Sequence, residues 1–237
     1  MSRRSPPFAA FEWMIAWRYL RARRSDGGVS VMTWISLIGI TLAVFALIAT
    51  LAVRTGFRAE FVDTILGANA HVTVYQIPVT DDFGKLDRKI YNYTEMAEAI
   101  SQVAGVTRAA PLIKSQVMAS YSGKRTGIQV FGISQDNLLT LPRIARPEKS
   151  IGSISDFTKG VAIGSGVARS LNATIGDKVK LVSPDGLKTA FGTSPRVKSY
   201  EIVYIFTAGR YDIDQTRLYM PFSEAQNYFN SPKAADE

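Results

Sequence analysis

A long uncharged stretch near the N-terminus constrains this chain more than any other feature. It runs from Val29 to Val53, VSVMTWISLIGITLAVFALIATLAV, and contains no Asp, Glu, Lys or Arg. About 18 consecutive apolar residues are enough for a helix to cross a bilayer, so we expect a transmembrane helix over 29–53, long enough to span with some tilt. A cleaved signal peptide is the alternative, but its apolar core is only about 7 to 15 residues long. The longer run, which leads directly into RTGFRAEF, favours a retained anchor.

The charges on either side of this stretch predict its orientation. The residues that follow it, 54–63, mix both signs, whereas arginines crowd the preceding side. Those arginines are Arg18, Arg21, Arg23 and Arg24. Because an excess of basic residues marks the cytoplasmic side of a span, we expect a cytoplasmic N-terminus in a bacterial inner membrane and an exported, periplasmic domain. The arginines are also expected to contact anionic lipid head groups.

The first 28 residues form the predicted cytoplasmic tail. Phe8, Phe11, Ile15 and Tyr19 recur near helical spacing, with the arginines on another side. This is the pattern of an amphipathic helix that lies in the membrane interface. A disordered basic tail is the alternative, which the high aromatic content of the segment disfavours.

Small residues form a stripe within the predicted span. Ser36, Gly39, Ala43, Ala46 and Thr50 recur at steps of three and four, which places them on one face of a helix. Helices in lipid pack closely through such stripes, so we expect this face to meet another helix, although small residues are common in any span.

Apolar residues at i+4 spacing, Phe57, Phe61 and Ile65, continue the helix up to Gly67. They predict a helical stalk over 54–67.

The exported part is predicted to be α+β, with a boundary between 140 and 141. Residues 68–140 are predicted to form a partial ferredoxin-like (βαβ) subdomain. Its expected elements are a strand at His71–Ile77, a helix capped by Thr94, and strands at 109–121 and 127–133. A short helix candidate, DNLLTL, follows the last of these strands. Over 141–237 we expect a mainly β subdomain with strands at 160–163, 178–182, 200–206 and 217–221. Its predicted helices are 165–171 and 222–229, the second with Ser223 as a possible cap.

The residues that could carry chemistry do not assemble into a catalytic or metal site. The chain has no Cys and a single His, His71. Gly164-Ser165-Gly166 precedes a helix but lacks the GK[ST] end of a phosphate-binding loop. We expect Asp212 and Asp214 to be solvated loop residues. The formal charge of +8 is spread along the chain rather than gathered in one block, so no nucleic-acid partner, cofactor or enzymatic activity is predicted.

The connection Ser183–Ser199, SPDGLKTAFGTSPRVKS, is long for neighbouring strands. It carries an aromatic residue among cations, a composition suited to docking another protein. A loop that is floppy or folded onto its own domain is the alternative. The candidate docking residues are Lys188, Thr189, Ala190, Phe191, Gly192, Pro195 and Arg196.

Several of these segments together resemble the transmembrane subunits of the lipoprotein-releasing (Lol) ABC transporter, within the broader macrolide-exporter type of ABC permease. The segments are AWRYLRARR, VSVMTWISLIGITLAVFALI, RTGFRAEFVDTILG, GVAIGSGVARSLNATIGDKVKLVSP and YEIVYIFTAGRYDIDQTRLYMPF. The resemblance implies a paired permease subunit, served by a separate ATPase subunit, that extracts lipoproteins and passes them to a soluble periplasmic carrier. It also implies that acyl chains lie beside the stripe and that Ser183–Ser199 is the carrier-docking hairpin, called the hook. The family often has Pro near the tip of the hook, where Ala190 and Phe191 stand here.

The resemblance further implies four membrane helices, of which the first is present before Glu237. We therefore expect the N-terminal part of such a permease, as a truncated gene product or fragment. Two alternatives stay open: a permease of another macrolide-exporter-like system, and a single-pass scaffold or regulator with a periplasmic binding domain.

Overall fold

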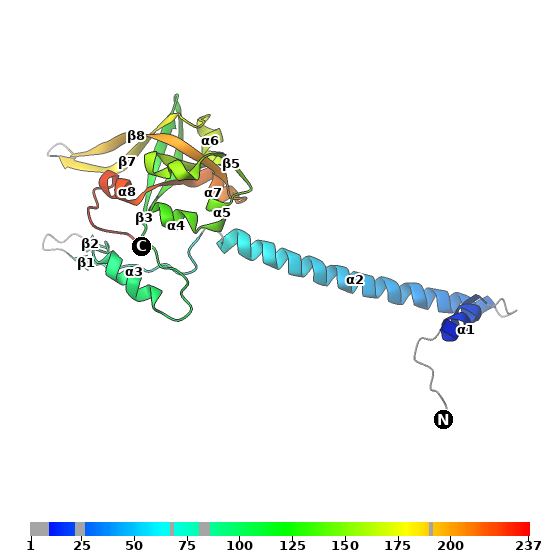
Figure 1. The fold of residues 1–237 in the computed structure, drawn as a ribbon. Coiled ribbons are helices and arrows are strands. Elements are labelled where there is room, and N and C mark those ends of the chain that lie inside the picture. The colour runs from blue at the N-terminus through cyan, green and yellow to red at the C-terminus, as the bar shows by residue number, and fades with distance from the viewer. Residues whose placement is uncertain (1–9, 22–26, 67–68, 81–85, 190–191) are drawn as a thin grey trace. The chain divides into compact units, whose positions relative to one another are not determined.

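The computed structural model describes residues 10–21, 27–66, 69–80, 86–189 and 192–237 (Figure 1). The chain forms two compact units, Met1–Glu60 and Phe61–Glu237. The described residues of the first unit are helical, and the second unit contains the sheets.

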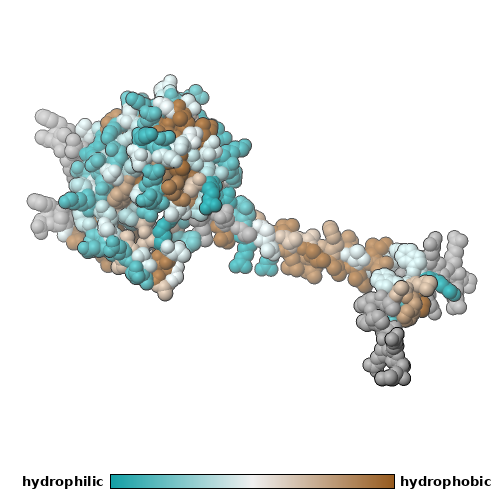
Figure 2. Space-filling view, viewed as in Figure 1, coloured by the Kyte–Doolittle hydropathy of each residue, from teal (hydrophilic) through white to brown (hydrophobic). Residues whose placement is uncertain are grey.

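Two helices account for the N-terminal region: α1 (Ala10–Arg21) and α2 (Gly27–Leu66). The predicted span over 29–53 and the helix that continues it lie in one helix, because α2 is continuous over 40 residues, or about 60 Å at the standard helical rise. Its stretch Val31–Val62 is long and apolar enough to cross a membrane. Apolar side chains cover the middle of α2 (Figure 2), and Phe45 is 67% exposed. Such a helix has to be covered by lipid or by other helices.

A seven-stranded sheet dominates the second unit. Its strands are β3 (Ile113–Tyr121), β4 (Lys124–Ile133), β5 (Lys149–Gly152), β6 (Val161–Gly164), β7 (Lys178–Thr189), β8 (Gly192–Thr207) and β9 (Arg217–Pro221). They follow the order β5-β8-β6-β9-β4-β3-β7, and β8 also pairs with β7. The order therefore returns to β8, which closes the sheet on itself and removes most of its free edges.

Alternating side chains divide the core between the two sides of this sheet. Val161 and Ile163 point into an inner cluster, whereas Ala162 between them belongs to an outer cluster. The inner cluster includes residues of α6 (Ser165–Leu171) and α8 (Phe222–Tyr228). The outer cluster includes residues of α4 (Gln135–Leu139), α5 (Pro142–Ala145), the 3₁₀ helix η1 (Ile154–Lys159) and α7 (Tyr211–Thr216). Helices thus cover both sides of much of the sheet.

The segment before the sheet contains β1 (Val79–Thr80), β2 (Leu86–Asp87) and α3 (Tyr93–Ser101). The end of the chain ties this segment down. Ala235 exchanges backbone hydrogen bonds of 2.8 and 3.0 Å with Ile90, and the backbone amide of Asp236 donates to the Leu112 carbonyl at 2.9 Å.

Two sequence predictions in this segment are wrong. His71–Ile77 is not in a strand, and the side chains of 71–75 are exposed. Its β-branched residues fit a half-buried pleated surface, but this segment is not paired in a ladder that would provide one. The residue at the N-cap of α3 is Asn92 rather than Thr94.

Other boundaries follow the sequence patterns more closely. The helix at 165–171 and the strand at 217–221 are confirmed, and α4 confirms a short helix within DNLLTL. Pro221, not Ser223, occupies the N-cap of α8. The strands β3 and β4, assigned to the subdomain 68–140, pair with β7 and β9 of 141–237. One sheet therefore crosses the predicted boundary, because pairing between distant strands leaves no local signal in the sequence.

Candidate docking face and hairpin

The predicted strand ends at 182 and 200 are wrong, because β7 continues to Thr189 and β8 begins at Gly192, so most of the predicted connection Ser183–Ser199 belongs to strands. The paired positions of β7 and β8 extend from Lys178↔Glu201 to Thr189↔Gly192, with a register shift between Ser183 and Leu187. The two strands form a hairpin at one end of the sheet (Figure 1). Strand β3 joins them only near the root, where its last pair with β7 is Met118↔Val182. Beyond Val182, the ladder of the hairpin is two-stranded.

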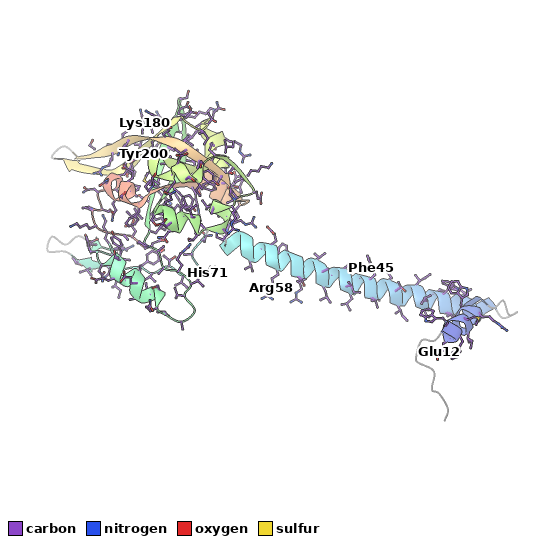
Figure 3. All side chains as sticks on the ribbon, viewed as in Figure 1. Glu12, Phe45, Arg58, His71, Lys180 and Tyr200 are labelled. Atoms are coloured by element: carbon purple, nitrogen blue, oxygen red, sulfur yellow. The ribbon has the colours of Figure 1, made fainter. Side chains whose placement is uncertain are left out.

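Residues that lie directly opposite each other on neighbouring strands share one side of a sheet, so the register defines two rows on the outer side of the hairpin root. The apolar row is Gly127, Met118, Val182 and Val197, on β4, β3, β7 and β8. The basic row, two positions away, is Arg125, Ser120, Lys180 and Ser199. Figure 3 labels Lys180 on β7 and Tyr200 on β8. We call these two rows together the docking face.

A groove overlaps the part of the docking face that is formed by Met118, Gly127, Val182 and Arg125. Its volume is about 810 Å³, and its lining includes Met118, Gly127, Val182, Pro184 and Pro195. Met118 is 43% exposed and Val197 is 53% exposed. The face therefore presents apolar side chains to solvent with cations beside them, a combination typical of the centre and rim of a protein interface.

The inner side of the hairpin root is occupied. Arg196, Lys198 and Tyr200 alternate along β8 and reach α8. The Arg196 guanidinium donates from Nη1 to the backbone oxygens of Asn227 at 3.0 Å and Tyr228 at 2.6 Å. A basic side chain at these carbonyls satisfies groups that the end of a helix leaves open.

The other two side chains, Lys198 and Tyr200, both bind the Glu224 carboxylate. Lys198 forms a salt bridge with Oε1 of Glu224, and the Tyr200 hydroxyl donates to the same oxygen at 2.9 Å. Burial, and then the hydrogen bond to the Glu224 carboxylate, raise the pKa of Tyr200. The phenol therefore stays protonated and remains a donor. The ring of Tyr200 also packs edge-on against Tyr228, with centroids 5.9 Å apart.

Comparison with known proteins identifies the type of domain that carries this face. The MacB-like periplasmic core domain family matches residues 33–235. The chain belongs to this family.

Curated relatives of this MacB-like core domain are subunits of lipoprotein-releasing systems. The transmembrane protein LolC of Neisseria meningitidis serogroup B is 29% identical over 227 residues, which cover 94% of this chain and 52% of that protein. LolC of Xylella fastidiosa (strain Temecula1) is 31% identical over 206 residues, 85% of this chain and 47% of that protein. LolE of Haemophilus influenzae is 23% identical over 230 residues, 91% of this chain and 51% of that protein. The chain spans about half the length of the curated relatives it matches.

Two solved structures are also similar to the chain. The extracellular domain of the ABC-type transporter YknZ from Gram-positive bacteria has a TM-score of 0.40 and 15% identity, and the match covers 62% of this chain and 70% of that chain. The periplasmic region of MacB from Actinobacillus actinomycetemcomitans has a TM-score of 0.39 and 13% identity, over 61% of each chain.

The predicted docking residues of the MacB-like core domain lie in different surroundings. Ala190 and Phe191 lie outside the described residues. Lys188 and Thr189 belong to β7 and Gly192 begins β8. Pro195 lines the groove, whereas Arg196 contacts α8 on the inner side. The hairpin was singled out from the sequence, but the contributions of β3 and β4 were not.

The strands β3 and β4 bring in residues that sequence reasoning missed. Met118 and Gly127 lie beside Val182 in the apolar row, although more than 50 positions separate them from the hairpin in sequence. The one available sequence signal is an apolar Met between polar neighbours, Gln116 and Ser120, on the same side of a strand. That signal marks an exposed apolar residue but does not reveal which strand lies beside it.

The Gly-Ser-Gly sequence has a packing role in the MacB-like core domain. A Cβ added to Gly164 would lie 2.4 Å from the backbone oxygen of Asp214, and one added to Gly166 would lie 2.8 Å from the same atom. The two glycines therefore allow α6 and α7 to approach closely.

Asp212 and Asp214 were expected to be solvated loop residues, but both lie in α7, and Asp214 is not solvated because it is 6% exposed. Its Oδ1 accepts a hydrogen bond from the Ala208 amide at 2.7 Å, and burial raises the pKa of its carboxyl. Asp212 is exposed and forms a salt bridge with Arg210, which lowers its pKa against the opposing effect of desolvation. The described residues contain no group of three or more His, Cys, Asp or Glu side chains placed to hold a metal ion.

The small-residue stripe lies on an open helix surface. Ser36, Gly39, Ala43, Ala46 and Thr50 are all exposed, and a Cβ added to Gly39 would have no atom within 4 Å. The Thr50 hydroxyl donates to the Ala46 carbonyl at 2.7 Å, so its polar group is satisfied within the helix. The stripe is thus free of obstruction for close approach of another helix.

The variant Gly39→Leu tests whether the small-residue stripe of α2 packs against another helix. If another helix packs on this stripe, we expect weaker association, because a leucine side chain at this position would hold that helix away from α2. The measurement is the fraction of dimer trapped by site-specific crosslinking in membranes. Ile40→Leu changes an exposed neighbour off the stripe and should leave that fraction unchanged. Equal trapping of both variants would contradict the assignment.

Proposed function

We propose that the chain supplies a membrane anchor and periplasmic core domain to a permease subunit of an ABC transporter that releases lipoproteins from the inner membrane. The observation that carries the proposal is the docking face at the hairpin root, in a chain whose curated relatives are named as LolC and LolE of lipoprotein-releasing systems. A surface of this kind suits the temporary binding of a soluble partner more than it suits chemistry. The conversion of ATP energy is assigned to a separate ATPase subunit.

Each proposed partner is assigned to a different part of the chain. The stripe Ser36–Thr50 packs against a second permease subunit, and lipoprotein acyl chains lie in the lipid-facing groove beside it. With the N-terminus in the cytoplasm, α1 lies on the inner membrane surface, where its Trp13 and Trp17 match the depth that aromatic rings prefer. Both rings are 64% exposed.

The docking face is assigned to the periplasmic lipoprotein carrier. Its apolar row can bury apolar side chains of the carrier, and the cations of its basic row, Arg125 and Lys180, favour carboxylates at the edge of the contact. Burial of such a small apolar surface gives a contact that forms and breaks readily. Reversible contact is what a hand-over step requires, because the carrier has to leave with its lipoprotein.

A photo-crosslinking experiment tests this proposal. A photoreactive amino acid is placed at Val197, in the docking face, and separately at Phe191 in the hairpin, in cells that produce the carrier. We expect crosslinks to the carrier from both positions, because the proposed contact includes the docking face and the hairpin that continues from it. Ile151 is the control position, since it is also an exposed apolar residue, 60% accessible, but lies on β5.

The pattern of crosslinks separates the outcomes. Carrier crosslinks from 197 and 191 but not from 151 support the proposal. The proposal would be contradicted if the domain is folded and protease-resistant but gives no carrier crosslink from either hairpin position. Equal crosslinking from all three positions would mean that the contact is not specific to the docking face.

A further inference from the structure

We infer that Arg196 is a positioning residue that fixes the inclination of the β7–β8 hairpin by clamping it to the end of α8, so that the groove at the docking face keeps its shape. The inference rests on the proposed function, since it concerns how that face is held ready for the carrier. It assigns Arg196 a different role from direct contact with the partner, which its place in the sequence had suggested.

The hairpin needs a support beyond its own ladder. After Met118↔Val182, the ladder continues only between β7 and β8, and the register shift between Ser183 and Leu187 interrupts it just beyond the root. A two-stranded ribbon is marginally stable in water by itself. A shift in register also bends the strands and weakens pairing locally. The point at which the hairpin leaves the sheet is therefore the point at which its direction is least determined by pairing.

Helix α8 is suited to be that support because it is fixed to the sheet. Ala225 is fully buried, and Tyr228 is 2% exposed. Ala225 packs closely against β4, since a Cβ added to Gly132 of that strand would lie only 2.2 Å from the Cβ of Ala225. The last turn of α8 therefore cannot shift without disturbing the inner core.

Arg196 links this fixed helix to the hairpin just before the register shift, one pair beyond the last residue of β7 that also pairs with β3. Its pair on β7 is Ser183, the residue at which the shift begins. Besides the two hydrogen bonds from its guanidinium to the carbonyls of Asn227 and Tyr228, its own backbone oxygen accepts a bond of 3.3 Å from the Tyr228 hydroxyl. Side chain and backbone of one residue are thus both held by the same end of α8. The contacts of Lys198 and Tyr200 with Glu224 lie closer to the sheet, where pairing already fixes the strand.

Successive side chains of β8 point to opposite sides of the hairpin, so a clamp on the inner side also affects the outer side. Pro195 and Val197, on either side of Arg196, belong to the outer side of the strand and to the groove or the docking face. A rotation of the hairpin about its root would move Pro184 and Pro195 relative to Met118 and change the shape of the groove that they line together. The clamp on the inner side therefore determines the shape of the surface on the outer side.

Distance measurements between two spin labels test the positioning directly. Because the chain has no Cys, labels attach only at the introduced pair Lys188→Cys on β7 and Asp136→Cys on α4, in the full chain in lipid nanodiscs. We expect a narrow distance distribution for the otherwise unchanged chain and a clearly broader one with Arg196→Ala. Arg196→Lys keeps a donor for the two carbonyls and should restore most of the narrow distribution. Arg125→Ala removes an arginine of the basic row on β4 and should leave the distribution narrow.

Carrier affinity, measured on the same nanodiscs without labels, completes the test. We expect Arg196→Ala to weaken binding of the periplasmic lipoprotein carrier by about tenfold, and Arg196→Lys to recover most of it. Weaker binding without a broader distribution would make Arg196 a direct contact and overturn the inference. A broader distribution with unchanged affinity would also overturn it. If the unchanged chain does not bind the carrier, the proposed function fails, and the spin-label distances alone decide whether Arg196 fixes the hairpin.

Discussion

Met118→Glu is expected to weaken carrier binding by more than about tenfold, which corresponds to about 1.4 kcal/mol. Met118 lies between Gly127 and Val182 in the apolar row and lines the groove. A carboxylate at this place has to lose its hydration when the partner covers it, and it repels acidic groups that the basic row would attract. Because Met118 is 43% exposed, the charge remains hydrated in the free protein and should cost little stability.

The measurement is the dissociation constant of the carrier for the full chain in nanodiscs. Ile151→Glu is the matched control, since it introduces the same charge at an exposed apolar residue on β5. The control should bind the carrier as the unchanged chain does. Equal affinities for the Met118 and Ile151 variants would remove Met118 from the binding surface.

Gly164→Ala is expected to destabilise the second unit by about 1–3 kcal/mol, the usual cost of forcing extra atoms into a packed site. The added Cβ would lie 2.4, 2.8 and 2.9 Å from three backbone atoms of Asp214, so no side chain can rotate away to make room. Asp214 is held in turn by its hydrogen bond to the Ala208 amide. Relief therefore requires α7 to move away from α6.

Thermal unfolding measures this loss, with an expected decrease of about 2–4 °C in melting temperature for each kcal/mol in a unit of this size. Gly127→Ala is the control, because a Cβ added there has no atom within 4 Å and its φ is not positive. It should stay within about 0.5 kcal/mol of the unchanged chain. A Gly164 variant that melts at the unchanged temperature would show that the contact between α6 and α7 can relax.

Local patterns predicted the elements that depend on neighbouring residues. The uncharged run and the i+4 aromatic residues after it are enough to specify α2, because a long apolar helix needs no partner in the same chain to be recognised. The helix at 165–171 and the strand at 217–221 follow in the same way from short apolar patterns between turn residues. In these places the local preference of the chain and the final fold agree.

The errors arise where distant residues decide the outcome. His71–Ile77 has the composition of a strand, but a strand exists only with a pairing partner, and its sequence does not specify one. Asp214 looks like a loop carboxylate until α6 packs against it and the Ala208 amide points to it. The side of β8 that Arg196 occupies is readable from alternation alone, but the presence of α8 on that side is not.

The same limit explains how much of the docking face was predictable. The hairpin stands out because its connection is long and contains an aromatic residue among cations. The apolar row also requires Met118 and Gly127, whose place beside the hairpin depends on the antiparallel pairing of β3 with both β4 and β7. That pairing joins residues far apart in sequence, and no local property of either strand encodes it.

Strand β8 belongs to both the hairpin and the closed sheet, which determines how the molecule responds to a mechanical load. Its first part pairs with β7, and its last part lies between β5 and β6. A tension applied at the hairpin and directed along β8 would shear the hydrogen bonds to β5 and β6 together instead of opening them one after another. A pull along β8 is therefore carried into the closed sheet by several hydrogen bonds that share the load.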